Sequence, residues 1–159
     1  GGKNMAPRQH MRKMKVGKIT FTEAYKAVYE YRQKFPEKAV TFYAQNYPAM
    51  GWAVLMAGGS CPVIPCTDKA FLKDAAIMEV EETNTDDYKR IVKSDIGSII
   101  YSKSGTEIPV QLSSGKYSLK YIHPSSGKVT MIDKLLKIND VYTLKVPDKK
   151  EGIYWFHKL

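Results

Sequence analysis

Cysteine and histidine are scarce in this sequence, which limits disulfide and metal chemistry. Only two cysteines, Cys61 and Cys66, occur among 159 residues, and they lie five positions apart. An extended strand of that length would hold them about 16 Å apart, which is beyond disulfide reach. The spacing is wider than in most zinc-binding pairs, and the three histidines are scattered. We therefore expect two free buried thiols, no structural metal and no cofactor.

Long hydrophobic runs are absent as well. The longest apolar stretch, residues 53–57, is far shorter than the roughly 20 residues that cross a membrane. The first residues, Gly1 and Gly2 followed by Lys3, lack the apolar region of a signal peptide. We expect no membrane-embedded segment.

Arginine is rare although the chain is basic. The net charge is +9, and only four of the 25 cations are arginine. Residues 1–18 carry six cations and no acid, an arm that could contact nucleic acid. Arginine dominates specific base contacts, and no nucleic-acid-binding motif accompanies the arm. We do not expect a nucleic-acid partner.

The first half alternates helical and strand patterns. Thr20 and Glu23 form a predicted capping box, and apolar residues then recur at helical spacing up to Pro36. We expect further helices over residues 48–57, ended by Gly58 and Gly59, and over residues 68–78. Short buried strands are expected over residues 38–44 and 60–65.

The second half is typical of an antiparallel sandwich. Seven strands separated by turn residues are expected over residues 79–83, 96–101, 106–112, 116–123, 128–136, 141–146 and 152–157. Tyr117 and Leu119 should share one face, and Ser118 and Ile122 the other. The polar residues 83–93 are the best linker, and Asp86 within them has too few oxygen neighbours for a calcium site.

The fold class is therefore α+β, a short β/α remnant followed by an antiparallel sandwich of about seven strands. We place the β/α segment at residues 1–82 and the sandwich at residues 83–159. About 80 residues cannot form a whole β/α barrel, which takes about 250. The first segment therefore needs a longer parent chain, the sandwich or another copy to complete it.

Two stretches carry a resemblance to a known family. Residues 115–128 end in Tyr-Ile-His-Pro-Ser-Ser-Gly-Lys, and residues 146–155 run from Val-Pro-Asp to Ile-Tyr-Trp. This pattern resembles the C-terminal sandwich, often labelled collagen-binding, of glycoside hydrolase-like proteins from gut bacteria. Residues 47–60, with Gly51-Trp52 and a later Ala-Gly-Gly-Ser, resemble the end of the same family's catalytic barrel.

The resemblance implies a parent enzyme that acts on glycans outside the cytoplasm. It implies a periplasmic, cell-surface or secreted location, and as partners a glycan and the missing N-terminal part of the barrel. Glycoside hydrolysis needs two carboxyl groups about 5–9.5 Å apart, and the sequence offers only one acid at the expected strand ends. We assign no catalytic residue.

Three polar residues follow the two predicted barrel strands. Gln45 and Asn46 could hydrogen-bond sugar hydroxyls, or they could be satisfied turn amides. Asp68 could act in a site, but a helix N-cap is the favoured interpretation.

Tyr154 and Trp155 are neighbours in the last strand, so their side chains point to opposite faces. One of them should be exposed, as a surface for stacking on a sugar, or should lie at a domain interface. The leading hypothesis is an accessory portion that is inactive alone. The alternatives are a stand-alone glycan- or matrix-protein-binding module and a homo-oligomeric structural protein.

Overall fold

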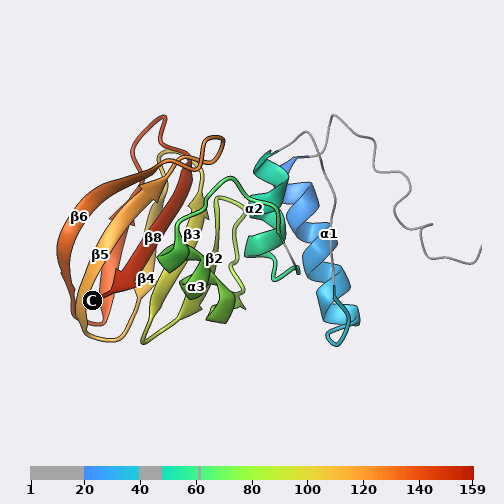
Figure 1. The fold of residues 1–159 in the computed structure, drawn as a ribbon, viewed down its shortest axis with the longest axis horizontal. Helices are drawn as coiled ribbons and strands as arrows, with labels where there is room; N and C mark the ends of the chain where they lie inside the picture. Colours follow the sequence, from blue (N-terminus) through green and yellow to red (C-terminus); the bar gives the residue numbers. More distant parts are fainter. Residues whose placement is uncertain (1–19, 40–47, 61) are drawn as a thin grey trace, which may run out of the picture.

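The structure is a computed structural model that describes residues 20–39, 48–60 and 62–159. Three helices are followed by eight strands, and Figure 1 shows the helices along one side of the sheets. The helices are α1 (Phe21–Lys34), α2 (Pro48–Met56) and α3 (Lys69–Ile77). The predicted α+β class is confirmed.

The ends of α1 and α2 form as local sequence rules predict. The Thr20 hydroxyl accepts from the Glu23 amide at 3.1 Å, and the Glu23 carboxylate accepts from the Thr20 amide at 3.2 Å. At the end of α2, Gly59 N–H donates to Val54 and Gly58 N–H donates to Leu55. These two bonds form a Schellman motif, which requires the left-handed φ of +81° at Gly58.

The strands build two antiparallel sheets. The larger sheet has the order β1-β2-β3-β8-β5-β6, and the smaller one pairs β4 with β7. The strands are β1 (Glu79–Glu81), β2 (Tyr88–Lys93), β3 (Gly97–Ser102), β4 (Glu107–Gln111), β5 (Gly115–Ile122), β6 (Val129–Ile138), β7 (Val141–Lys145) and β8 (Gly152–Lys158).

Strand β2 lies where we predicted a linker. Burial alternates along β2 although several of its residues are charged: Lys89 and Ile91 are buried, and their neighbours are less buried. Lys89 tolerates burial because its ammonium lies 3.3 Å from the Asp86 carboxylate and 4.8 Å from the Tyr25 ring centroid. The predicted domain boundary at residue 83 falls between β1 and β2 of one sheet.

The predicted strand over residues 60–65 is not observed at its described positions, which form irregular structure. Pro62 and Pro65 cannot donate to a ladder. Of the predicted strand over residues 38–44, residues 40–44 lie outside the described residues.

Two hydrophobic cores divide the molecule into three layers. One core lies between the helices and the larger sheet, and includes Trp52, Phe71 and Trp155. The other lies between the two sheets and includes Tyr117 and Leu119. Ile122 belongs to the first core, so the predicted alternation along β5 is confirmed. The larger sheet is thus covered on both faces, by the helical layer (α1 to α3) over part of one face and by β4 and β7 on the other.

None of the described helices is long and apolar enough to cross a membrane.

The raised pKa values of two buried tyrosines predict a loss of stability at alkaline pH. Burial raises the pKa of Tyr25 and of Tyr154 from 10.0 to about 12. The neighbouring Tyr29 adds a smaller increase to the pKa of Tyr25, and Tyr121 does the same for Tyr154. The folded state therefore holds both protons between pH 10 and 12, where the unfolded state releases them. The free energy of unfolding should be steady below pH 10 and fall by roughly 1–3 kcal/mol per tyrosine as pH rises to about 12.

Urea unfolding at a series of pH values, followed by circular dichroism, measures this loss. Tyr25→Phe should remove one tyrosine's share of the slope. A midpoint that does not change between about pH 8 and 11.5 would contradict the prediction.

Candidate functional site

Asp74 of α3 joins the helical layer to the larger sheet. Asp74 is only 5% exposed. The Oδ2 atom accepts from the Trp155 indole Nε1 at 2.9 Å and lies 2.7 Å from Nδ1 of His157. Because a buried carboxylate is costly without partners, these contacts define where α3 sits. We call Asp74, Trp155 and His157 the interface anchor.

The anchor brings together residue types that could perform acyl transfer. Ser118 of β5 is the register partner of His157, so it lies beside His157 on the face of the sheet that Asp74 of α3 approaches. A hydrolase also needs hydrogen-bond donors for the developing oxyanion. Here β5 and β8 pair with each other, so their backbone amides are used in the sheet. We therefore interpret the group as structural.

Aromatic rings extend the anchor through the first core. Phe71 lies edge-on to Trp155 with ring centroids 5.3 Å apart, and edge-on to Trp52 at 5.9 Å. The Trp52 indole donates to the Pro124 carbonyl at 2.8 Å, in the turn after β5. Each of the two tryptophans thus ties the helical layer to the sandwich by one directional bond.

The turn after β5 also touches the helical layer through its backbone. A Cβ added at Gly127 would lie 2.5 Å from the Pro65 carbonyl oxygen, and its φ is +74°. Only glycine meets both conditions without strain. The Pro-Ser-Ser-Gly turn, which carries part of the family resemblance, therefore has a packing role here.

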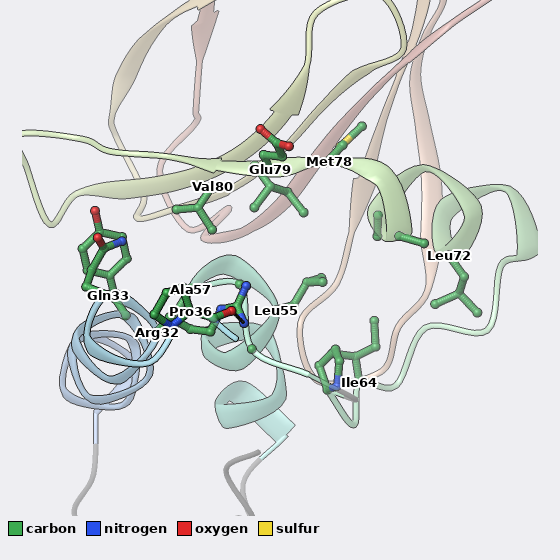
Figure 2. Close-up of a pocket in the computed structure, with 17 residues that line it drawn as sticks. Arg32, Gln33, Pro36, Leu55, Ala57, Ile64, Leu72, Met78, Glu79 and Val80 are labelled. Carbon is green, nitrogen blue, oxygen red and sulfur yellow. Dashed lines mark hydrogen bonds between the residues drawn. The ribbon is translucent and has the colours of Figure 1, made fainter. Parts of the chain in front are cut away.

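A cleft of about 790 Å³ lies where the helices meet β1 and β2. Figure 2 shows residues from all three helices and β1 around it, with Arg32 and Gln33 at one end and Leu72 at the other. Polar and apolar groups share its walls, and Leu55 and Ile64 lie between these ends. We call it the helical cleft.

The charged side chains of the helical cleft lie on opposite walls. The Arg32 guanidinium donates to the Pro36 carbonyl at 3.2 Å and to the Lys38 carbonyl at 3.3 Å, so it caps the end of α1. Glu79 lies on the opposite wall, on β1. Walls that combine polar and apolar groups in this way are typical of surfaces that pack against polypeptide.

Apolar side chains also lie exposed on the helical layer. Leu72 and Ile77 of α3 are 43% and 48% exposed. Tyr31 and Phe35, at the end of α1, lie with ring centroids 4.8 Å apart and planes tilted by 44°, and are also exposed. Val63 is 80% exposed. The described part of the helical layer thus carries five exposed large apolar side chains, a feature typical of interaction sites.

Asp68 is placed as a helix cap. Its Oδ1 atom accepts from the Phe71 amide at 2.9 Å at the start of α3. This geometry agrees with the capping role that the sequence favoured, and it uses one of the carboxylate's oxygens.

Tyr154 and Trp155 are both buried, at 2% and 0% exposure. Trp155 faces the helices and Tyr154 faces the smaller sheet. Trp155 therefore takes the interface position that we considered, and neither ring presents an open face to a sugar. Sequence could predict the opposite orientations, but not that both faces of β8 are covered.

Gln45, Asn46 and Cys61 lie outside the described residues. Cys66 is a buried free thiol, and burial raises its pKa above the ordinary value. In the part of the chain that the structure describes, no three His, Cys, Asp or Glu side chains gather as metal ligands.

Sequence reasoning missed the interface anchor. Asp74 and His157 are 83 positions apart, and no local pattern connects them. One local signal existed: Asp74 follows Phe71 by three positions and shares its buried side of α3. A charged residue on the apolar side of a helix needs a partner.

Comparison with solved structures finds partial likeness to glycoside hydrolases. A family 5 glycoside hydrolase from Bacteroides vulgatus matches 52% of this chain and 20% of its own, with 13% identity and a TM-score of 0.39. Another chain, described as a glycoside hydrolase, matches 71% of this chain and 26% of its own, with 15% identity and a TM-score of 0.41. The chain thus spans about a quarter or less of either.

No curated protein matches the sequence. The model of one protein family, described as a domain of unknown function (DUF6298), matches residues 1–78. The match ends one residue before β1 begins at Glu79, so it covers the helical layer and stops at the larger sheet.

Proposed function

We propose that this chain is the C-terminal accessory portion of a glycoside hydrolase-like protein that acts on glycans outside the cytoplasm, and that it is not catalytic alone. In this proposal the helical layer is the end of a larger body, which the preceding polypeptide of the parent protein completes. The sandwich holds the helical layer in a fixed position.

The observation that carries the proposal is that the helical layer is packed on the sheet and yet leaves apolar groups uncovered. It shares a continuous core with the sheet, through Trp52, Phe71 and Trp155. It also exposes apolar residues, among them Leu72 and Ile77, and a cleft lies open between it and strands β1 and β2. A layer that leaves apolar side chains uncovered in this way is typical of an incomplete body.

Association measurements test this proposal. The purified chain should bind the separately produced preceding segment of its parent, as measured by calorimetry. Leu72→Glu should weaken the complex by at least about tenfold, because it would place a charge in the apolar contact. The matched control is Leu135→Glu on β6, which is 51% exposed but lies far from the helical layer.

Self-association is the rival outcome. If light scattering shows a dimer that Leu72→Glu dissociates, and the preceding segment does not bind, a second copy covers the surface and the proposal is wrong.

A polysaccharide panel tests the claim of inactivity. No turnover is expected from the purified chain. Turnover that is abolished by Asp68→Asn or by Glu151→Gln would show a catalytic carboxylate and overturn the claim.

The alternative function is a stand-alone module that binds a glycan or a matrix protein. The predicted anchors, Tyr154 and Trp155, are buried. Support for this alternative comes instead from a second cleft, beside Tyr101 and Glu151.

A further inference from the structure

The second cleft lies where the start of α1 meets the sandwich, and its volume is about 320 Å³. We call it the junction cleft. Phe21 of α1 and Tyr101 of β3 line it on the side of the helices, and Tyr88 of β2, which packs toward the smaller sheet, borders it. Charged side chains from loops complete it, including Asp86, Lys103 and Glu151.

The aromatic part of the cleft is tightly built. The Phe21 ring stacks on the Tyr101 ring, with centroids 3.9 Å apart and planes 11° apart. Tyr101 is buried, whereas Phe21 is half-buried. Part of the Phe21 ring therefore reaches the surface, where the C–H face of a sugar ring could pack against it.

Glu151 lies close to two tyrosines. The Tyr121 hydroxyl donates to the Glu151 carbonyl at 2.9 Å, which holds the loop before β8. Burial and the nearby Glu151 carboxylate raise the pKa of the Tyr101 phenol above its ordinary value. The Glu151 carboxylate has lone pairs for a ligand's hydroxyl groups.

The charges of the junction cleft cancel. Lys89 pairs with Asp86 at 3.3 Å, and Lys103 and Glu151 add one charge of each sign. The nearby start of α1 is occupied by its own capping box, in which Glu23 also places an acid. The cleft therefore has no excess charge to attract an anion, and its donors and acceptors suit hydroxyl groups.

We propose that the junction cleft binds a short stretch of a neutral glycan chain. Glu151 and Asp86 accept from sugar hydroxyls, Lys103 donates to them, and Phe21 contacts the ring face. The choice of a glycan among neutral polyhydroxylated ligands rests on the proposed function. The location of the site rests on the cleft alone.

Calorimetry with the full chain tests this site. The probes are cellotetraose, xylotetraose and mannotetraose, with inorganic phosphate and polygalacturonate as anionic comparisons. At least one neutral oligosaccharide should bind, and the anions should not compete with it. Glu151→Gln and Lys103→Met should each weaken binding about tenfold, because each removes a charge-assisted hydrogen bond.

Matched controls lie on the smaller sheet, away from the cleft. Glu107→Gln and Lys145→Met change the same residue types at exposed positions of β4 and β7, and should leave binding unchanged. Unfolding curves of all four variants should coincide within about 0.5 kcal/mol, as expected for surface changes.

Three results would overturn the inference: no neutral probe binds, binding is indifferent to Glu151→Gln and Lys103→Met, or an anion binds in preference. These results are separate from those of the association experiment, which depends on Leu72 and not on the cleft. The accessory role can therefore fail while the glycan site stands, and the reverse also holds.

Discussion

Replacing Trp155 by alanine should lower the free energy of unfolding by about 3–5 kcal/mol. The ring is 0% exposed and packs edge-on against Phe71 of α3, so its loss opens a cavity between the helical layer and the sheet. The substitution also removes the indole donor of Asp74. Because domains of this size are stable by only about 5–15 kcal/mol, the variant should unfold at a much lower urea concentration.

Trp155→Phe separates the two contributions. It keeps most of the ring packing and loses the N–H group, so it should cost about 1–3 kcal/mol. Leu135→Ala, at an exposed site on β6, should change stability by about 0.5 kcal/mol or less. If Trp155→Ala unfolds within about 1 kcal/mol of the parent chain by circular dichroism, the ring does not join the two layers.

Replacing Asp74 by alanine should lower the free energy of unfolding by about 2–5 kcal/mol. The buried Trp155 indole loses its acceptor, and an unpaired buried donor costs about 1–3 kcal/mol. His157, which is half-buried, also loses its contact with the carboxylate. Asp74→Asn keeps a carbonyl acceptor of the same shape, and should cost less than the alanine variant.

Hydrogen exchange distinguishes a local effect from a global one. In Asp74→Ala, the amides of α3 should exchange faster than those of β5, because α3 loses the bond that holds it to β8. The control is Asp133→Ala on β6, whose carboxylate accepts only from a nearby backbone amide, that of Leu135. If amide exchange accelerates equally in α3 and β5, the interface anchor does not stabilise α3 specifically.

Several elements could be predicted because their causes are local. The capping box at Thr20 and the Schellman motif at Gly58 depend on residues three to five positions apart. Turn residues separate the strands from β3 to β8, and alternation predicted which face of β5 carries Tyr117 and which carries Ile122.

Other elements depended on distant partners. Strand β2 resembled a linker because Lys89 is charged, and its burial is compensated by Asp86 and by the ring of Tyr25 in α1. The predicted strand over residues 60–65 is irregular at its described positions, since Pro62 and Pro65 cannot donate to a ladder.

The amino-acid sequence alone determined the α+β class, the helix ends and the alternation of the strands, because these follow from interactions within a few residues. The tertiary structure decided that helices cover one face of β8, that Trp155 is therefore buried rather than exposed, and that Asp74 meets His157. The physical reason is that burial and hydrogen-bond pairing are properties of the assembled layers, in which residues more than 80 positions apart share one core.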